Sequence, residues 1–111
     1  MDLWQEIQEK QKLLDKAIKT LADNGKDLAK KERAYKIAVN KKALELRAED
    51  MPVTLINQVI YGYEDIADLR FERDTAQSVY NANQEYINVI KLLIRILEGQ
   101  LNREYGNIKN V

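Results

Sequence analysis

Residues 66–101 read IADLRFERDTAQSVYNANQEYINVIKLLIRILEGQL, and apolar residues recur through this stretch in steps of three and four. This spacing places one edge of a helix against a partner helix. A second pattern of the same kind precedes the only proline, Pro52. The two stripes consist of Trp4, Ile7, Leu14, Ile18, Leu21, Leu28, Tyr35, Val39 and Leu46, and of Ile66, Leu69, Ala76, Tyr80, Ile87, Ile90, Ile94, Leu97 and Leu101. They predict an all-α fold, a long antiparallel helical hairpin resembling a coiled coil.

Breaks in the pattern divide the chain into a helix at about 2–49, a tip helix at about 54–61 and a helix at about 64–105. Asp2 is the expected N-cap of the first helix and Thr54 that of the tip helix. We expect the whole chain, residues 1–111, to form a single helical domain, because this length supports one domain at most.

Three glycines bear on where the helices end. Gly62 is expected to close the tip helix in a left-handed conformation, and Gly106 to end the last helix. Gly25 leaves two alternatives: it ends an early helix, or the first helix continues through it. The unbroken spacing from Leu14 to Tyr35 favours the continuous helix.

If the chain reverses about residues 52–62, residues whose numbers total about 113 lie opposite each other, so Tyr35 should meet Ser78. Glu32 and Asn83 then make the middle of the hairpin more polar than its ends. A polar residue at such a position usually fixes the register of two helices.

The region from Tyr86 to Leu101 is apolar over a wider arc than one partner helix can cover. Four residues are left on its flanks: Val89, Leu92, Leu93 and Ile96. Exposed apolar side chains of this size favour self-association. We therefore expect a homo-oligomer, with a dimer of hairpins forming a four-helix bundle favoured. The alternative is that the N-terminal third of the first helix covers these residues.

The composition argues against catalysis. The chain has no histidine and no cysteine, which removes the common general base, thiol nucleophiles and most zinc sites. Carboxylate pairs such as Asp65 with Asp68 lie among lysines and arginines, so we interpret them as ion-pairing surface rather than a metal site. We expect no enzyme activity, no metal and no cofactor.

Charge is balanced over the chain, with 18 basic and 18 acidic residues, but basic residues gather in the second half of the first helix. Nucleic-acid binding draws its affinity from neutralised phosphates. A candidate nucleic-acid face therefore contains Lys30, Lys31, Arg33, Lys41 and Lys42. Acidic neighbours dilute this charge, so nucleic-acid association is the alternative function and not the favoured one.

The tip helix carries an apolar face made of Leu55, Ile56, Val59 and Ile60. This face either plugs the end of the hairpin or docks a protein partner that the sequence does not identify. The N-terminus is acidic and polar, unlike a secretory signal, and the most apolar run is too short to span a membrane. We expect a cytoplasmic protein without membrane contact.

A distinctive set of residues surrounds the tip: Leu46-Arg47, the run from Pro52 to Ile56, Gly62, and the run from Ile66 to Asp74, with Tyr80, Glu85, Ile87 and Lys91 downstream. This set resembles small helical proteins of phages and prophages of Gram-positive bacteria. It implies an early-region accessory protein acting in a bacterial host cell, and it transfers no catalytic residue. The favoured function is thus a non-enzymatic interaction or assembly protein, and the resemblance implies that it is a phage accessory factor. The alternative is a nucleic-acid-associated helical protein in phage replication or recombination.

Overall fold

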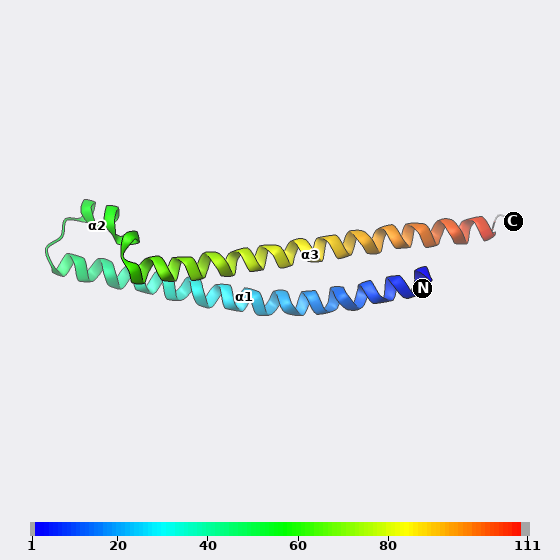
Figure 1. Ribbon diagram of the computed structural model, residues 1–111, viewed down its shortest axis with the longest axis horizontal. Helices are drawn as coiled ribbons and strands as arrows, with labels where there is room; N and C mark the ends of the chain where they lie inside the picture. The colour runs from blue at the N-terminus through cyan, green and yellow to red at the C-terminus, as the bar shows by residue number, and fades with distance from the viewer. Residues whose placement is uncertain (1, 110–111) are drawn as a thin grey trace. The chain divides into compact units, whose positions relative to one another are not determined.

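The computed structural model describes residues 2–109, with side chains described through residue 106. Its elements are α1 (Leu3–Ala48), α2 (Val53–Val59), the 3-10 helix η1 (Ile60–Gly62) and α3 (Glu64–Lys109), as Figure 1 shows. No strand occurs among the described residues. The all-α prediction is therefore confirmed, with two long helices and a short one between them.

The chain divides into two compact units. Unit 1 contains Met1–Asp23 and Asn81–Val111, and unit 2 contains Asn24–Tyr80. In unit 2, Lys42 contacts Asp65 and the earlier Lys31 contacts the later Glu72, so α1 and α3 pack antiparallel. The two long helices likewise pack against each other in unit 1, where Ala17 of α1 shares a core with residues of α3.

The first helix begins and continues as the sequence predicts. Asp2 is its N-cap, since the Asp2 Oδ1 atom accepts a 2.7 Å hydrogen bond from the backbone N–H of Gln5. The helix then runs through Gly25 without interruption, which decides between the two alternatives. A Cβ atom at residue 25 would lie 3.4 Å from Cε2 of Tyr80, so the glycine permits α3 to approach closely.

The first helix ends in a left-handed residue, Asp50, whose φ is 63°. The backbone N–H of Met51 bonds to the carbonyl of Leu46, and that of Asp50 bonds to the carbonyl of Arg47. These two bonds form a Schellman motif, and Met51 packs on the core cluster containing Leu46 as the motif requires. The left-handed position therefore lies before Pro52 and not after the tip helix.

The predicted caps of the tip helix are wrong. Its N-cap is Pro52, whose carbonyl accepts a hydrogen bond from Ile56, and Thr54 lies inside the helix without capping it. Gly62 ends a 3-10 turn, and no glycine among the described residues has a positive φ. The 3-10 turn ends the helix without needing a left-handed glycine, because Tyr63 bonds to the carbonyl of Ile60.

Gly106 does not end α3, which continues to Lys109. A glycine costs about 1 kcal/mol in a helix relative to alanine, and this cost alone does not force a stop. The expected end at about residue 105 is therefore too early.

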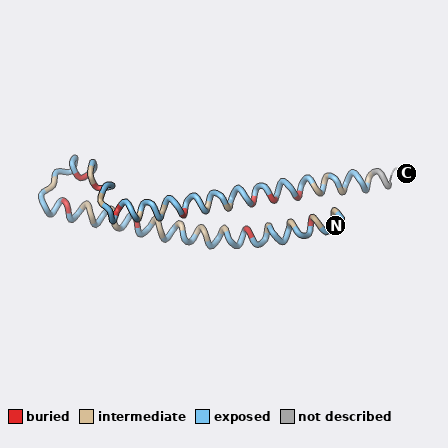
Figure 2. The backbone as a smooth tube through the Cα atoms, in the orientation of Figure 1, coloured by how far each residue is buried: buried red, intermediate tan, exposed pale blue. Residues whose placement is uncertain are grey.

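Each unit has a small core of its own, and buried positions recur along both long helices (Figure 2). In unit 1 the core cluster contains Ala17, Ile87, Ile90 and Ile94, with Leu14 and Leu21 packed against it. In unit 2 a cluster contains Leu46, Ile56 and Ile60, with Val39, Ala43, Met51 and Tyr63 packed against it. The α3 stripe predicted from sequence is buried or half-buried throughout.

The predicted α1 stripe contains two errors. Trp4 is 58% exposed and Ile18 is 47% exposed, whereas Ala17 is buried and was not predicted. Steps of three and four between Leu14 and Leu21 admit either Ala17 or Ile18, and the structure buries Ala17. The position of Ala17 recurs seven residues away at half-buried Lys10 and Asn24, so this edge of α1 is the covered one.

The predicted pairing of the two helices is displaced. The Tyr35 ring faces Arg73, which precedes the expected Ser78 by five residues. The cause is the tip, residues 53–62, which folds back onto Val39, Ala43 and Leu46. The tip therefore occupies the end of α1, and α3 begins its contacts farther back, at Lys42.

Candidate interaction surfaces

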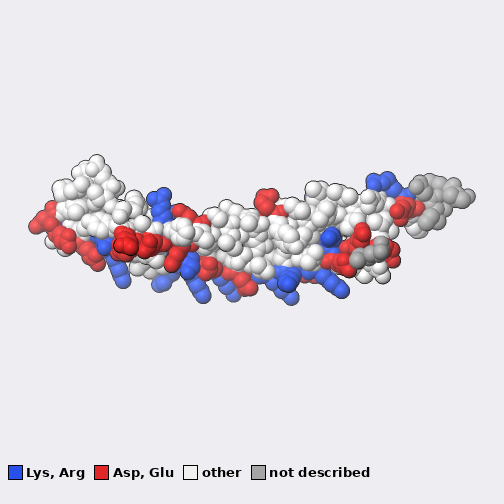
Figure 3. All heavy atoms as spheres, in the orientation of Figure 1, with Lys and Arg blue, Asp and Glu red and all other residues white. Residues whose placement is uncertain are grey.

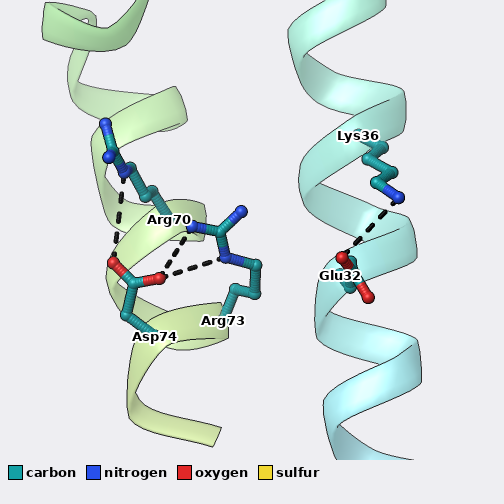
Figure 4. A network of polar contacts seen from close by, with 5 residues as sticks. All are labelled: Glu32, Lys36, Arg70, Arg73 and Asp74. Atoms are coloured by element: carbon teal, nitrogen blue, oxygen red, sulfur yellow. Dashed lines mark hydrogen bonds and ion pairs between the residues drawn. The ribbon is translucent and has the colours of Figure 1, made fainter. Parts of the chain in front are cut away.

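Of the paired carboxylates Asp65 and Asp68, Asp65 lies in an ion pair with Lys42, whereas Asp68 is in none of those found among the described residues. Asp74 contacts both Arg70 and Arg73 on α3, and Lys36 pairs with Glu32 on α1, as Figure 4 shows. Among the described residues, no three acidic, histidine or cysteine side chains converge as a metal site requires. This surface stabilises helices through exposed charge pairs, each worth about 0.2–1 kcal/mol.

Arg73 links this charged surface to the core of unit 2. Its guanidinium lies 4.6 Å from the ring centre of buried Tyr35, a cation–π contact, and donates a 2.8 Å hydrogen bond to Asp74. That hydrogen bond raises the pKa of Arg73, and partial desolvation opposes it. The side chain thus covers Tyr35 while its charge stays paired.

A second charged group lies where α3 begins. Lys42 Nζ is 3.1 Å from Asp65, 3.9 Å from Glu45 and 4.9 Å from the ring centre of Tyr63. The hydrogen bond between Lys42 and Asp65 raises the pKa of the lysine and lowers that of the carboxyl. The group therefore links α1 to Tyr63 and to the first turn of α3 at this end of unit 2.

The structure divides the candidate nucleic-acid face. Lys31 and Lys42 point toward α3, where Glu72 and Asp65 pair with them. Lys30, Arg33 and Lys41 are exposed, and none of them belongs to an ion pair found among the described residues. In the view of Figure 3, lysine and arginine side chains lie interspersed with aspartate and glutamate side chains and do not form one continuous basic patch on this face.

The tip residues also fall into two groups. Ile56 and Ile60 are buried against Leu46, with exposed fractions of 4% and 3%. Leu55 is exposed and Val59 is half-buried. The buried pair plugs the end of unit 2. Only the remaining apolar side chains of the tip are open to a partner.

The wide apolar region of α3 in unit 1 is exposed as its sequence suggests. Val89, Leu92, Leu93 and Ile96 are 51%, 52%, 39% and 47% exposed, and α1 does not cover them. Sequence reasoning missed one member of this surface, Tyr86, which is 49% exposed.

Two parallel stripes account for this exposure. The inner stripe faces α1 and contains Asn83, Ile87, Ile90, Ile94, Leu97 and Leu101, all buried or half-buried. The outer stripe contains Ala82, Tyr86, Val89, Leu93 and Ile96, all exposed. Each outer residue precedes an inner one by one position, which corresponds to a turn of about 100° around the helix. The same alternation of three and four in the outer stripe is the sequence signal that identifies Tyr86.

A groove adjoins the outer stripe on the side toward α1. It has a volume of about 500 Å³. Its lining residues are Glu6, Glu9 and Lys10 of α1 with Leu93, Ile96, Leu97 and Gln100 of α3. The groove has an apolar wall on α3 and a charged wall on α1, so it suits a side chain that is apolar with a polar end.

A comparison of the chain with protein-family models, curated proteins and solved structures gave no match. None of the described helices has an apolar segment of the length needed to cross a bilayer.

Proposed function

We propose that this protein is a non-enzymatic assembly protein that self-associates through the outer stripe of α3. The observation that carries this proposal is the uncharged, exposed stripe of unit 1, with Leu92 beside it. Its spacing is that of a helix–helix contact, and it lies about 90–100° away from the contact with α1. That angle suits a helix with two neighbours in a four-helix bundle.

The energetics support self-association. Complete burial of a valine, leucine or isoleucine side chain is worth about 1.5–3 kcal/mol, and each exposed member of the stripe forgoes roughly half of this. Among the described residues of unit 1 few are buried: Ile7, Ala17, Ile87, Ile90 and Ile94. A second copy would cover the exposed residues and enlarge this small core.

Light scattering coupled to size exclusion, over a range of protein and salt concentrations, tests the proposal. We expect a mass of at least twice 12.9 kDa. The double variant Leu93→Lys, Ile96→Lys should reduce the mass to that of one chain because it places charge in the stripe. Leu44→Lys is the matched control, since Leu44 is 72% exposed but lies in unit 2. A wild-type monomer would refute the proposal, as would a double variant of unchanged mass.

The tip gives the assembly a second surface. Leu55 and Val59, together with exposed Val53 and Tyr61, leave apolar area on residues 53–62 after Ile56 and Ile60 are buried. We propose that this area contacts a protein partner, and that the protein is a phage-type accessory factor of the bacterial cytoplasm. Retention of a partner by wild type but not by Leu55→Ser with Val53→Ser supports this role.

The second candidate function is nucleic-acid association, favoured by the exposure of Lys30, Arg33 and Lys41. Phosphate contacts predict binding that weakens steeply with salt. Titration of the wild type and of a variant with all three residues changed to glutamine, against single- and double-stranded DNA, tests it. Equal DNA binding by the two proteins would show that these three basic residues do not form a nucleic-acid-binding face.

A further inference from the structure

We propose that two copies pair through their α3 helices in antiparallel orientation, with a two-fold axis at the level of Lys91, and that Tyr86 of each copy fills the groove of the other. This inference rests on the proposed self-association and specifies its geometry. Three observations within unit 1 lead to it.

The first observation is the centre of the exposed apolar surface. Its five large members are Tyr86, Val89, Leu92, Leu93 and Ile96. Their positions along the helix average to about residue 91, so an axis at that level gives the greatest overlap of two identical surfaces. In this register Val89 faces Leu93 of the second copy, and Tyr86 faces Ile96 of the second copy.

The second observation is the order of positions in the stripe. Antiparallel helices pair the two alternating positions of the heptad with each other. With the axis at residue 91, Val89 of each copy faces Leu93 of the other copy. Tyr86 of each copy likewise faces Ile96 of the other. Ala82 faces Gln100 of the second copy, so a small and a polar residue close each end. Leu92 lies on the flank of the stripe, next to the axis, where it meets Leu92 of the second copy.

The third observation is the position of the groove. Its wall on α3 is formed by Leu93, Ile96, Leu97 and Gln100. The proposed axis brings Tyr86 of the second copy to the middle of that wall. The tyrosine ring would contact the apolar wall, and its hydroxyl would donate a hydrogen bond to Glu6 or Glu9 on the opposite wall.

The charges of unit 1 agree with a second copy as the occupant. Glu85, Lys91 and Arg95 are the only charged residues of α3 between Asn81 and Leu97, and none of them lies on the outer stripe. A nucleic acid or a strongly charged peptide would find no complementary charge on the stripe. An identical stripe provides a surface of the same length, spacing and polarity.

Spin labels test the geometry, and the absence of cysteine allows single labels to be placed without background. Asn81, Asn88 and Asn102 are exposed and lie off the outer stripe. For an antiparallel pair the axial separation of equivalent sites grows by about 3 Å for each residue from the axis, twice the helical rise. We expect the axial component of the distance between equivalent labels to be about 9 Å for Asn88→Cys, about 30 Å for Asn81→Cys and about 33 Å for Asn102→Cys.

The outcomes are distinct. Three equal, short separations would mean a parallel pair and would overturn the proposal. A separation of about 20 Å at residue 81 with about 44 Å at residue 102 would place the axis half a heptad earlier and would overturn it too. Either result leaves self-association intact. A monomeric mass in the light-scattering experiment would instead overturn both proposals.

The groove is tested by substitution of Tyr86. Tyr86→Ala should raise the dissociation constant of the assembly by about 30-fold or more, as truncation of a buried anchor does at other interfaces. Tyr86→Phe, which keeps the ring, should raise it less. Tyr105→Ala is the matched control, because Tyr105 is exposed on the same helix outside both stripes. An unchanged constant for Tyr86→Ala, with helix content preserved, would overturn the assignment of the groove.

Discussion

The side-chain amide of Asn83 on α3 donates a 3.1 Å hydrogen bond to the backbone carbonyl of Ala17 on α1. Asn83 lies in the inner stripe, where the neighbouring positions Ile87 and Ile90 are buried isoleucines. An apolar residue would satisfy this position in several registers, whereas the amide finds its acceptor in only one. The contact therefore fixes how α1 and α3 align in unit 1, as polar core residues do in coiled coils.

Asn83→Ala removes this hydrogen bond and should lower the free energy of unfolding by about 1 kcal/mol relative to Asn88→Ala. Asn88 is exposed on the same helix, so the gain in helix propensity on changing asparagine to alanine cancels between the two variants. Denaturant unfolding of both variants measures the difference. Equal stabilities would show that the contact contributes nothing to unit 1.

Gly25 of α1 lies close to the ring of Tyr80 on α3. A Cβ atom at residue 25 would lie 3.4 Å from the ring, at the limit of ordinary contact, and the glycine is in a regular helix. Gly25→Ala should gain part of the roughly 1 kcal/mol of helix propensity, whereas Gly25→Leu should destabilise the protein by about 1–3 kcal/mol because it collides with the ring.

Gly99→Ala is the control for this pair, because its Cβ would meet only the flexible end of Arg103 at 3.7 Å. Gly99→Ala should raise the free energy of unfolding by about 1 kcal/mol, the full difference in helix propensity between glycine and alanine. Tyr80→Ala should also rescue Gly25→Leu, since it removes the obstacle. If Gly25→Leu remained as stable as wild type, the close approach of the two helices would be refuted.

The pair of Lys42 and Asp65 predicts a pH dependence of stability. The hydrogen bond from Lys42 lowers the pKa of Asp65 in the folded protein below its ordinary value of about 3.9. The contribution of the ionised Asp65 carboxylate to the stability of the fold is therefore present above that pH and is lost as the pH falls through the lowered pKa. The pKa of Lys42 is raised, so the pH dependence is reversed. Protonated Lys42 stabilises the fold below about pH 10.4, and this stabilisation is lost at higher pH.

Unfolding midpoints measured from pH ~7 down to pH ~2.5 should fall less for Asp65→Asn than for wild type. Asp68→Asn should follow the wild-type curve, because Asp68 is exposed and belongs to none of the ion pairs found among the described residues. Identical curves for all three proteins would show that the pair does not contribute to folding.

The tip separates buried from exposed apolar residues, and substitution distinguishes them. Ile56→Ala should cost about 2–5 kcal/mol because the side chain is 4% exposed within the core of unit 2. Leu55→Ala, at a residue 41% exposed, should change stability much less. Thermal unfolding compares the two neighbours directly. A large loss for Leu55→Ala with little for Ile56→Ala would reverse the assignment.

Much of the fold follows from apolar spacing, because a helix in contact with one neighbour must repeat its buried positions every three and four residues. The α3 stripe from Ile66 to Leu101 could therefore be predicted residue by residue. In α1 the spacing between Leu14 and Leu21 admits both Ala17 and Ile18, and the larger apolar side chain of Ile18 is the misleading choice. Trp4 fails similarly: it lies three residues before Ile7 and its size suggests burial, but its neighbour Leu3 is the half-buried residue.

The register and the tip could not be predicted in the same way. Spacing determines which face of α1 meets α3 but leaves their relative sliding undetermined. That sliding depends on the tip, which packs back onto Leu46 instead of extending the hairpin. Exposure on α3 was predictable as an excess of apolar residues, and Tyr86 could have been included because it lies three residues before Val89 and seven before Leu93.

The left-handed residue of the connection is Asp50 and not Gly62, and this reversal gives a final prediction. Asp50 has a φ of 63°, which costs a residue with a side chain about 1–2 kcal/mol. Asp50→Gly relieves this strain but increases the conformational entropy of the unfolded chain, so it should raise the free energy of unfolding by about 0.5–1 kcal/mol.

Gly62→Ala should also be neutral or stabilising, since Gly62 has no positive φ and an added Cβ meets nothing within 4 Å. Denaturant unfolding of the two variants measures both effects. A marked loss of stability for Gly62→Ala would mean that residue 62 has a backbone conformation or a neighbour that excludes a side chain, contrary to its observed geometry.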